Sequence, residues 1–368
     1  MLQRENTKHY SVKISIKNIL KSFLQILENK IMQENFSLKN YNTFGVEAKA
    51  NYFIEIHSIP ELIDAVTFAQ EKSLPILFLG GGSNILLTKD FEGVAIKLSL
   101  KGINEEIINE NHALITAKAG ENWHEFVIYC LNKNWGGLEN LSLIPGNVGT
   151  SPIQNIGAYG TEIKDHFVNC KVLNLETLEI EIFNLEKCRF GYRDSIFKQE
   201  GKNKYVILEV TFKLTIQNHI IKTEYGAIKS ELENLGITNP TIQDVSKAVI
   251  NIRQSKLPDP KTIGNAGSFF KNPTIAVEHF EKLKQQFSNI QGYPNENSVK
   301  IPAGWLIEQC GWKGKQIENV ATHKLQSLVI INANGEASGK EIYDFSTQII
   351  DSVNQKFGII LEREVNVL

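Results

Sequence analysis

The sequence has few cysteines and no long apolar run, and these shortages exclude whole classes of protein. None of the four cysteines belongs to a C-x-x-C pair; they are Cys130, Cys170, Cys188 and Cys310. This scatter argues against a zinc site or a dithiol redox centre, so we expect no metal. No apolar stretch approaches the length of a membrane-spanning helix, and the N-terminus lacks the apolar core of a signal peptide. We therefore expect a cytoplasmic protein with no membrane partner.

An excess of charge of one sign is also absent. The formal net charge is -2, whereas a nucleic-acid-binding protein usually carries a basic excess or stripe. We therefore expect no nucleic-acid partner. With 368 residues, of which 42% are hydrophobic, the chain can fill the cores of two or three ordinary domains.

The most distinctive stretch runs from Leu141 to Gly160 and reads LSLIPGNVGTSPIQNIGAYG, with four glycines and no charged residue. Glycine allows a backbone to turn sharply and a ligand to approach it closely. Consecutive backbone N–H groups in such turns can bind phosphate oxygens without a lysine. The sequence therefore indicates a phosphate-binding loop here, and a pair of tight turns between buried strands is the alternative.

A second loop of this kind, GGGSN at 80–84, follows the apolar run 76–79. It is not a Walker A loop, because no Gly-Lys-Ser/Thr follows, and the third glycine of a dinucleotide fingerprint is missing. A bare glycine turn is again the alternative.

The periodicity of the chain predicts helices and strands without a regular βαβ repeat, which favours an α+β fold. Ser58-Ile59-Pro60-Glu61 has the form of a capping box that opens a helix. An uncharged glycine turn is expected at 264–268. Further helices are predicted at 16–27, 123–131, 245–252 and 342–353, and strands at 76–79, 206–214 and 359–368.

Five stretches, in this order along the chain, resemble the UDP-N-acetylenolpyruvoylglucosamine reductase (MurB) family. They are NTFG at 42–45, GGGSN at 80–84, IPGNVGTSPIQNIGAYG at 144–160, RFGYRDSIFK at 189–198 and GNAGSFFKNP at 264–273. The resemblance begins near Asn35 and continues to the C-terminus. Met32 is the last methionine, and one hypothesis is that translation of the native protein begins there.

The resemblance implies an FAD-binding unit of the vanillyl-alcohol-oxidase (PCMH) type, built from two α+β subdomains, and a C-terminal α+β substrate-binding domain. The implied divisions are an N-terminal extension at 1–34, FAD-binding subdomain 1 at 35–100, subdomain 2 at 101–245 completed by 358–368, and the substrate-binding domain at 246–357.

By similarity, both glycine-rich loops bind FAD, which needs phosphate cradles and many neutral polar partners. Many oxidases of this fold attach the flavin covalently through histidine or cysteine, and neither loop contains either residue, so we expect non-covalent FAD. The implied cofactor-binding residues are Gly80, Gly81, Gly82, Ser83, Asn84, Pro145, Gly146, Gly149, Thr150, Ser151, Gln154, Asn155, Ile156 and Gly157.

The family reaction implies three catalytic residues. NADPH reduces the flavin, a hydride passes from flavin N5 to the vinyl carbon of an enolpyruvyl ether, and the adjacent carbon is then protonated. Arg193 matches the arginine that stabilises the developing negative charge, Ser268 the proton donor, and Glu364 the assisting glutamate. Without the resemblance, Arg193 would be a surface cation paired with Asp194. Ser268 would be an ordinary turn hydroxyl, and Glu364 an exposed carboxylate.

The expected substrate is a UDP-sugar, with NADPH as co-substrate, and we expect a monomer. Lys256, Lys271 and Asn272 lie near Ser268 in the sequence and could meet the UDP pyrophosphate. Tyr225 resembles the loop tyrosine of the subgroup whose substrate is covered by a lid. Gln326 resembles a further substrate contact.

Two alternatives remain from the sequence. One is another FAD-dependent oxidase of the same fold that uses oxygen as acceptor. The other is a catalytically silent nucleotide-binding regulator, which would have no reason to keep Arg193, Ser268 and Glu364 together.

Overall fold

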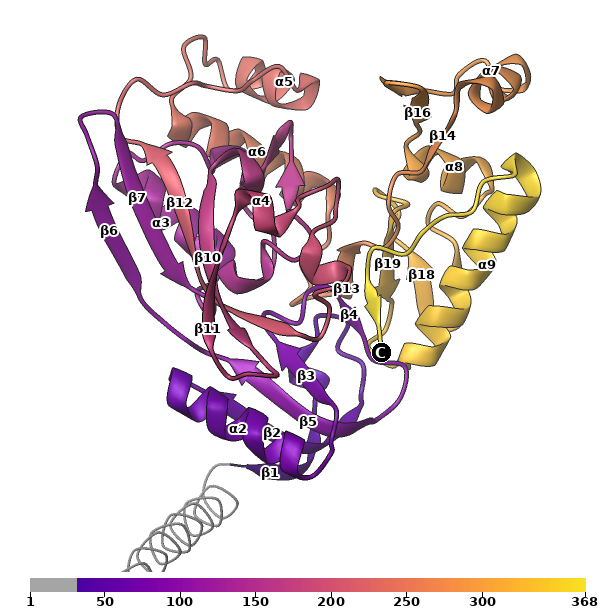
Figure 1. The fold of residues 1–368 in the computed structure, drawn as a ribbon. Helices are drawn as coiled ribbons and strands as arrows, with labels where there is room; N and C mark the ends of the chain where they lie inside the picture. The colour runs from indigo at the N-terminus through magenta and orange to yellow at the C-terminus, as the bar shows by residue number, and fades with distance from the viewer. Residues whose placement is uncertain (1–31) are drawn as a thin grey trace, which may run out of the picture.

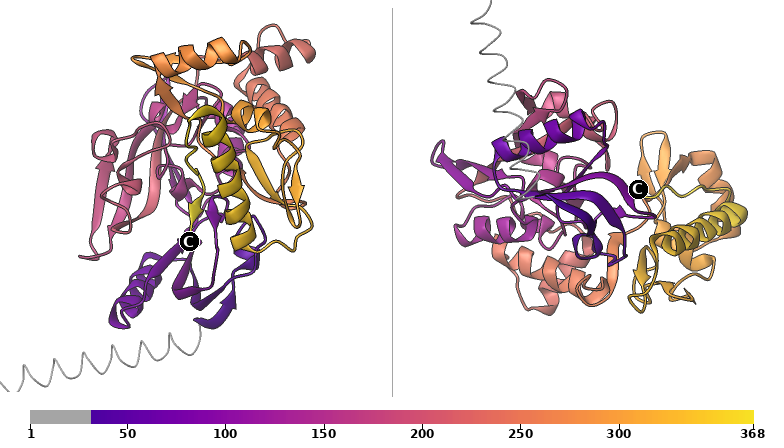
Figure 2. Two further views of the ribbon diagram at one scale, coloured as in Figure 1. Left: turned by 90° about the vertical axis from the view of Figure 1, so that its right-hand side faces the viewer. Right: turned by 90° about the horizontal axis from the view of Figure 1, so that it is seen from below.

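The computed structural model describes residues 32–368, so the helix expected at 16–27 lies outside the described residues. Figure 1 shows a small N-terminal sheet with one covering helix, a larger sheet beside it, and a C-terminal group that ends in a long helix. In the two views of Figure 2, the chain returns after this helix to the N-terminal sheet region, where it ends. The last residues of the chain lie beside the segment 84–88.

The first sheet has the strand order β1-β2-β5-β3, with β1 antiparallel and the other pairs parallel. The helix α2 begins where the capping box predicts, because the Ser58 hydroxyl accepts a hydrogen bond from the Glu61 N–H at 3.4 Å. Its buried face packs on the sheet. The elements are β1 (Gln33–Ser37), β2 (Lys49–Ile56), α2 (Ile59–Glu71), β3 (Ile76–Leu79) and β5 (Phe91–Leu98).

The second sheet is antiparallel, with the order β11-β10-β12-β7-β6. The strand and the helix predicted for this region are confirmed as β12 and α3. Trp123 and Phe126 of α3 pack against Phe212 of β12, with ring centroids 5.8 and 5.6 Å apart. The elements are β6 (Ile103–Ile107), β7 (His112–Lys118), α3 (Trp123–Asn132), β10 (Phe167–Asn174), β11 (Ile180–Asn184) and β12 (Tyr205–Thr215).

Short elements lie in the loops that connect the longer strands and helices of these two sheet regions. They are η1 (Lys39–Tyr41), β4 (Ile85–Leu86), η2 (Glu139–Leu141), η3 (Val148–Thr150), β8 (Gly157–Ala158), β9 (Thr161–Glu162), η4 (Ile163–Asp165), α4 (Leu185–Cys188) and η5 (Ile196–Lys198).

Two helices, α5 and α6, pack against each other and lead into the C-terminal group. That group contains a sheet of order β13-β19-β18-β17 and a smaller one of order β14-β16-β15. The elements are α5 (Gly226–Asn234), α6 (Ile242–Lys256), β13 (Gly264–Ser268), β14 (Thr274–Ala276), α7 (Val277–Gln286), β15 (Tyr293–Asn295), β16 (Ser298–Lys300), α8 (Ala303–Gln309), β17 (Gln316–Ile317), β18 (Val320–Thr322), β19 (Val329–Asn332), α9 (Gly339–Phe357) and β20 (Asn366–Val367).

The glycine turn expected at 264–268 is wrong, because these residues form the strand β13, which pairs with β19. Glycine has a packing role here. A β-carbon on Gly264 would lie 2.2 Å from the Phe44 carbonyl oxygen, so two backbones meet at this position.

The C-terminal strand expected at 359–368 is much shorter than predicted, since only Asn366–Val367 forms a strand, β20. It pairs with β4, which lies in the segment 35–100. The last residues of the chain therefore pair with the segment 35–100, and their expected attachment to 101–245 stays a prediction. In addition, α6 runs across the division expected at 245/246. The other divisions stay predictions.

The expected α+β fold class is confirmed. Within residues 32–368, no helix has both the length and the apolar character to cross a membrane. In the same range, no group of three His, Cys, Asp or Glu side chains is placed to hold a metal ion.

Candidate active site

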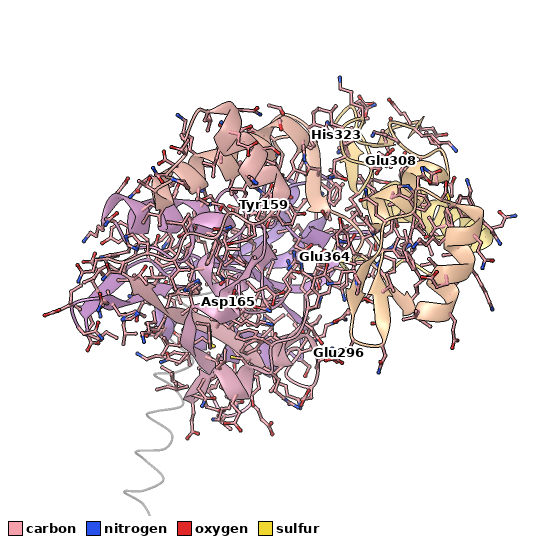
Figure 3. The ribbon with its side chains drawn as sticks, turned by 90° about the horizontal axis from the view of Figure 1, so that it is seen from above. Tyr159, Asp165, Glu296, Glu308, His323 and Glu364 are labelled. Atoms are coloured by element: carbon pink, nitrogen blue, oxygen red, sulfur yellow. The ribbon has the colours of Figure 1, made fainter. Side chains whose placement is uncertain are left out.

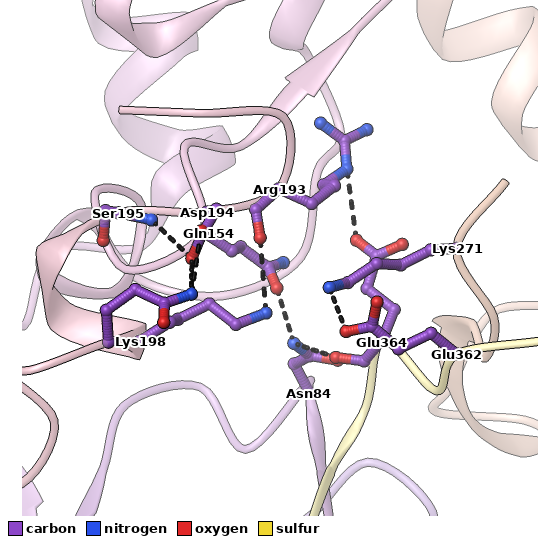
Figure 4. Close-up of polar contacts among 10 residues, drawn as sticks. Asn84, Gln154, Arg193, Asp194, Ser195, Lys198, Lys271, Glu362 and Glu364 are labelled. Carbon is purple, nitrogen blue, oxygen red and sulfur yellow. Dashed lines mark hydrogen bonds and ion pairs between the residues drawn. The ribbon is translucent and has the colours of Figure 1, made fainter. Parts of the chain in front are cut away.

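The two glycine-rich loops lie directly against each other. A β-carbon on Gly81 would be 2.9 Å from the Cα of Gly146, so a side chain at position 81 would collide with the second loop. The Asn84 amide nitrogen donates to the Gln154 side-chain oxygen at 2.8 Å and links the same two segments (Figure 4). Loops far apart in the sequence thus form one surface.

This surface has backbone N–H groups without protein acceptors. In the described chain, the N–H groups of residues 81–84 and of Gly146 donate no hydrogen bond to protein. Several adjacent free N–H groups form an anion-binding concavity. The pyrophosphate of a dinucleotide would fit such a concavity without a cationic side chain.

The glycines of the loops also serve the protein's own packing, which the sequence interpretation missed. Gly82 has φ +64°, and a β-carbon there would lie 2.0 Å from the Tyr41 carbonyl oxygen. A β-carbon on Gly149 would lie 2.4 Å from the β-carbon of Ala119. The approach of a ligand is therefore not needed to explain these two glycines.

The remaining residues expected around the cofactor differ in their exposure and in whether their side chains already have hydrogen-bond partners. Asn155 is fully buried, and its side chain bonds Glu162, the Gly191 carbonyl and the Lys164 N–H at 2.9–3.2 Å. Its side chain thus holds the loop. Buried residues are Ser151 and Ile156, half-buried ones are Gly80, Thr150 and Gly157, and Pro145 is exposed.

Arg193 and Glu364 meet across the boundary between the second sheet region and the C-terminal strand segment (Figure 4). The Arg193 Nε lies 3.2 Å from a Glu364 carboxylate oxygen, and Arg193 Nη2 donates to the Gly157 carbonyl at 2.5 Å. Asp194 instead accepts hydrogen bonds from the Ser195 N–H and the Gln199 amide. The alternative of an Arg193–Asp194 surface pair is therefore wrong.

Glu364 is a buried carboxylate surrounded by cations, which contradicts the exposed carboxylate that strand alternation alone would suggest. Only 14% of its side chain is exposed. Burial raises the pKa of Glu364, and the nearby charges of Arg193, Lys198 and Lys271 oppose that rise. Lys198 donates to the Arg193 carbonyl at 3.3 Å, and burial lowers the pKa of Lys198.

Ser268 lies at the end of β13, and the residues that follow it run beside the segment that carries Glu364. The Glu364 N–H donates to the carbonyl of Phe269 at 2.8 Å, so the residue after Ser268 is bonded directly to Glu364. The Ser268 side chain is exposed and has no hydrogen-bond partner within residues 32–368. Its hydroxyl is free to meet a ligand.

The four expected substrate residues lie on several elements. Tyr225 precedes α5, is 53% exposed, and packs edge-on against Tyr159 with ring centroids 5.3 Å apart. Asn272 accepts a hydrogen bond from the Ala303 N–H at 2.9 Å, which fixes its side chain. Lys256 is the exposed last residue of α6, and Gln326 is half-buried beside the start of β19.

Three further residues of this region were not predicted from the sequence. Tyr159, labelled in Figure 3, packs edge-on against Tyr225. Tyr192 has the Lys300 ammonium 3.5 Å from its ring centroid. Both tyrosines stood inside quoted motifs, GAYG and GYRD, so the signal was present.

Arg253 is the third residue that was missed. Its Nε donates to the Leu143 carbonyl at 3.2 Å, and burial lowers its pKa. It forms no ion pair with a carboxylate in the described chain. A buried cation without a carboxylate favours an anionic ligand nearby. Its spacing of three residues from Lys256 on one helix face was the available signal.

Two parts of the chain match known domain families, and together they indicate the class of protein. Residues 50–178 match the FAD binding domain family. Residues 259–368 match the UDP-N-acetylenolpyruvoylglucosamine reductase C-terminal domain. An FAD-binding domain is therefore joined to a C-terminal domain that is characteristic of one enzyme family.

Comparisons over nearly the whole chain agree. The UDP-N-acetylenolpyruvoylglucosamine reductase of Flavobacterium johnsoniae is 52% identical over 92% of this chain and 99% of that protein. That of Pseudomonas syringae pv. syringae is 46% identical over 91% and 98%. The MurB crystal structure from Thermus caldophilus shares the fold, with a TM-score of 0.62, 23% identity, and coverage of 91% and 99%. The chain belongs to the UDP-N-acetylenolpyruvoylglucosamine reductase family, and the resemblance is confirmed. It is an FAD-dependent oxidoreductase of this family.

Proposed function

We propose that the protein reduces the enolpyruvyl ether of UDP-N-acetylglucosamine enolpyruvate to UDP-N-acetylmuramate, in the cytoplasm, with NADPH as reductant. One arrangement carries this proposal. Arg193 pairs with Glu364 at 3.2 Å, and Glu364 is bonded through its backbone to the residue that follows Ser268. A cation and a carboxyl group from distant parts of the chain thus meet, and the Glu364 backbone is bonded to the residue that follows a free hydroxyl.

The residues of the two loops fit FAD. The free N–H groups of residues 81–84 and Gly146 would hold the pyrophosphate, and the uncharged side chains around them suit the neutral parts of the cofactor. When bound, FAD supplies the hydride transfer between NADPH and the vinyl carbon. Neither loop has a histidine or cysteine to form a covalent link, so we propose that binding is non-covalent.

The protein's own side chains stabilise the negative charge that develops on the substrate and donate one proton to it. Hydride addition to the vinyl carbon places negative charge on the adjacent carbon and its carboxylate. The Arg193 guanidinium, held by the Gly157 carbonyl, stabilises that charge. Ser268 then donates its hydroxyl proton to the adjacent carbon. Glu364, which pairs with Arg193, assists at the enolpyruvyl group.

The UDP part of the substrate would be held by groups around this centre. Lys256, Lys271 and Asn272 offer charge and hydrogen bonds to its pyrophosphate. Tyr225, in edge contact with Tyr159, would cover the bound sugar nucleotide. Gln326 would provide a further polar contact.

Absorbance spectroscopy of the purified protein tests this function. A flavin band that acid releases into solution would support non-covalent FAD. Under anaerobic conditions, NADPH should bleach the band and the enolpyruvyl UDP-sugar should restore it. Restoration by oxygen but not by this substrate would favour the alternative oxidase, and a colourless protein would favour a silent binder.

A further inference from the structure

Arg363 immediately precedes Glu364, and the family motifs quoted above give it no role. Residues 362–364 pair with 269–271. The Lys271 N–H donates to the Glu362 carbonyl at 2.9 Å, and Arg363 forms an isolated bridge with Phe270. Because successive side chains of an extended strand point to opposite faces, Arg363 faces away from Glu364.

The Arg363 side chain is anchored on helix α9 by three contacts. Its Nε donates to the Ser346 hydroxyl at 2.8 Å, and its Nη2 donates to the Thr347 hydroxyl at 2.6 Å. Its guanidinium carbon lies 4.3 Å from the centroid of the Tyr343 ring. In the described chain it forms no ion pair with a carboxylate. The planar guanidinium group therefore contacts Ser346, Thr347 and Tyr343 in a fixed arrangement, and a lysine ammonium group could not reproduce these contacts.

The contacts of Arg363 with α9 hold a segment of the chain that has little regular secondary structure. Between the end of α9 at Phe357 and the short strand β20, residues 358–365 form no helix or strand of their own. Downstream, the segment is held at Asn366, which bonds the Asn84 carbonyl at 2.9 and 3.1 Å. Upstream, the contacts of Arg363 bind it to α9. Glu364 lies between these two anchors.

We propose that Arg363 is a positioning residue, which holds the Glu364 carboxyl group against Arg193 by fixing the segment that carries Glu364 to α9. This inference rests on the proposed function, because it assumes that Glu364 assists the substrate half-reaction. It adds a part of helix α9, remote from the two cofactor loops, to the machinery of the reaction.

The test compares the two half-reactions of the flavin-loaded protein by anaerobic stopped-flow absorbance. Arg363→Met keeps the apolar stem and removes the guanidinium group. Reoxidation of the reduced flavin by UDP-N-acetylglucosamine enolpyruvate should become about tenfold slower, and reduction by NADPH should stay within about twofold. Arg363→Lys should be nearly as slow. Lys340→Met is the matched control, because it removes an exposed cation from the same helix and should change neither step.

A double-mutant cycle separates positioning from general destabilisation. If Arg363 acts through Glu364, adding Arg363→Met to Glu364→Gln should slow reoxidation by less than about twofold further. An undiminished effect in that background, or an equal loss in both half-reactions, would overturn the inference. If Arg363→Met does not fold, Thr347→Val removes one acceptor alone and should slow reoxidation in the same direction, and an unchanged rate would refute it. If the substrate fails to reoxidise the unaltered protein, the proposed function itself fails.

Discussion

Replacement of Ser268 by alanine tests the proposed chemistry without disturbing the fold. The Ser268 side chain is exposed and has no hydrogen-bond partner in the described chain. Loss of such a hydroxyl should change the free energy of unfolding by no more than about 0.5 kcal/mol. Any large change in rate must then come from the reaction.

The expected size of that change follows from the role of the hydroxyl. Only the substrate half-reaction needs a proton at carbon, so NADPH should reduce the flavin of Ser268→Ala at close to the normal rate. Reoxidation should slow by the ~10²–10⁴-fold of a lost general acid. This corresponds to about 3–5 kcal/mol of barrier at about 1.4 kcal/mol for each tenfold change. Ser268→Cys should recover part of the loss, because a thiol can still deliver a proton.

Stopped-flow absorbance separates the two steps, and thermal unfolding of the loaded protein checks the stability. Normal reoxidation in Ser268→Ala would remove this residue from the mechanism. Equal slowing of both half-reactions would also refute the reasoning, because it would mean that the substitution disturbs the cofactor itself.

Three further predictions follow from the site. Burial raises the pKa of Glu364 above its usual value near 4.5. Between the unfolded-state and the folded-state pKa, the folded protein therefore binds more protons than the unfolded chain. The free energy of unfolding should then fall as pH rises through this window. Glu364→Gln should reduce this fall in pH-dependent denaturant melts, and identical profiles would contradict the shift. Tyr225→Phe should weaken affinity for the UDP-sugar and leave flavin content unchanged; loss of flavin would sink its assignment as a covering residue. Gly81→Ala should part the two loops and lower flavin content, whereas Gly226→Ala, where a β-carbon meets open space, should not; full flavin content in Gly81→Ala would show that the loop contact is dispensable.

Much of the fold could be predicted because its signals are local. The start of α2 is set by Ser58 and Glu61, three residues apart, and the structure confirms that cap. The strand predicted at 206–214 alternates in the sequence and is confirmed as β12. The glycine-rich loops could be located, but the reason for Gly82 could not be predicted, because the atom that excludes a side chain belongs to Tyr41.

The sequence by itself determined the family, the positions of the two loops and the residues that could carry the chemistry, because motifs and periodicities are properties of short segments. Only the tertiary structure decided which of those residues meet. Arg193 pairs with Glu364 and not with its neighbour Asp194. Residues 264–268 form a strand because they pair with β19, and the last residues of the chain pair with β4. Burial and charge pairing depend on distant segments brought together by the common core, and no local pattern specifies that approach.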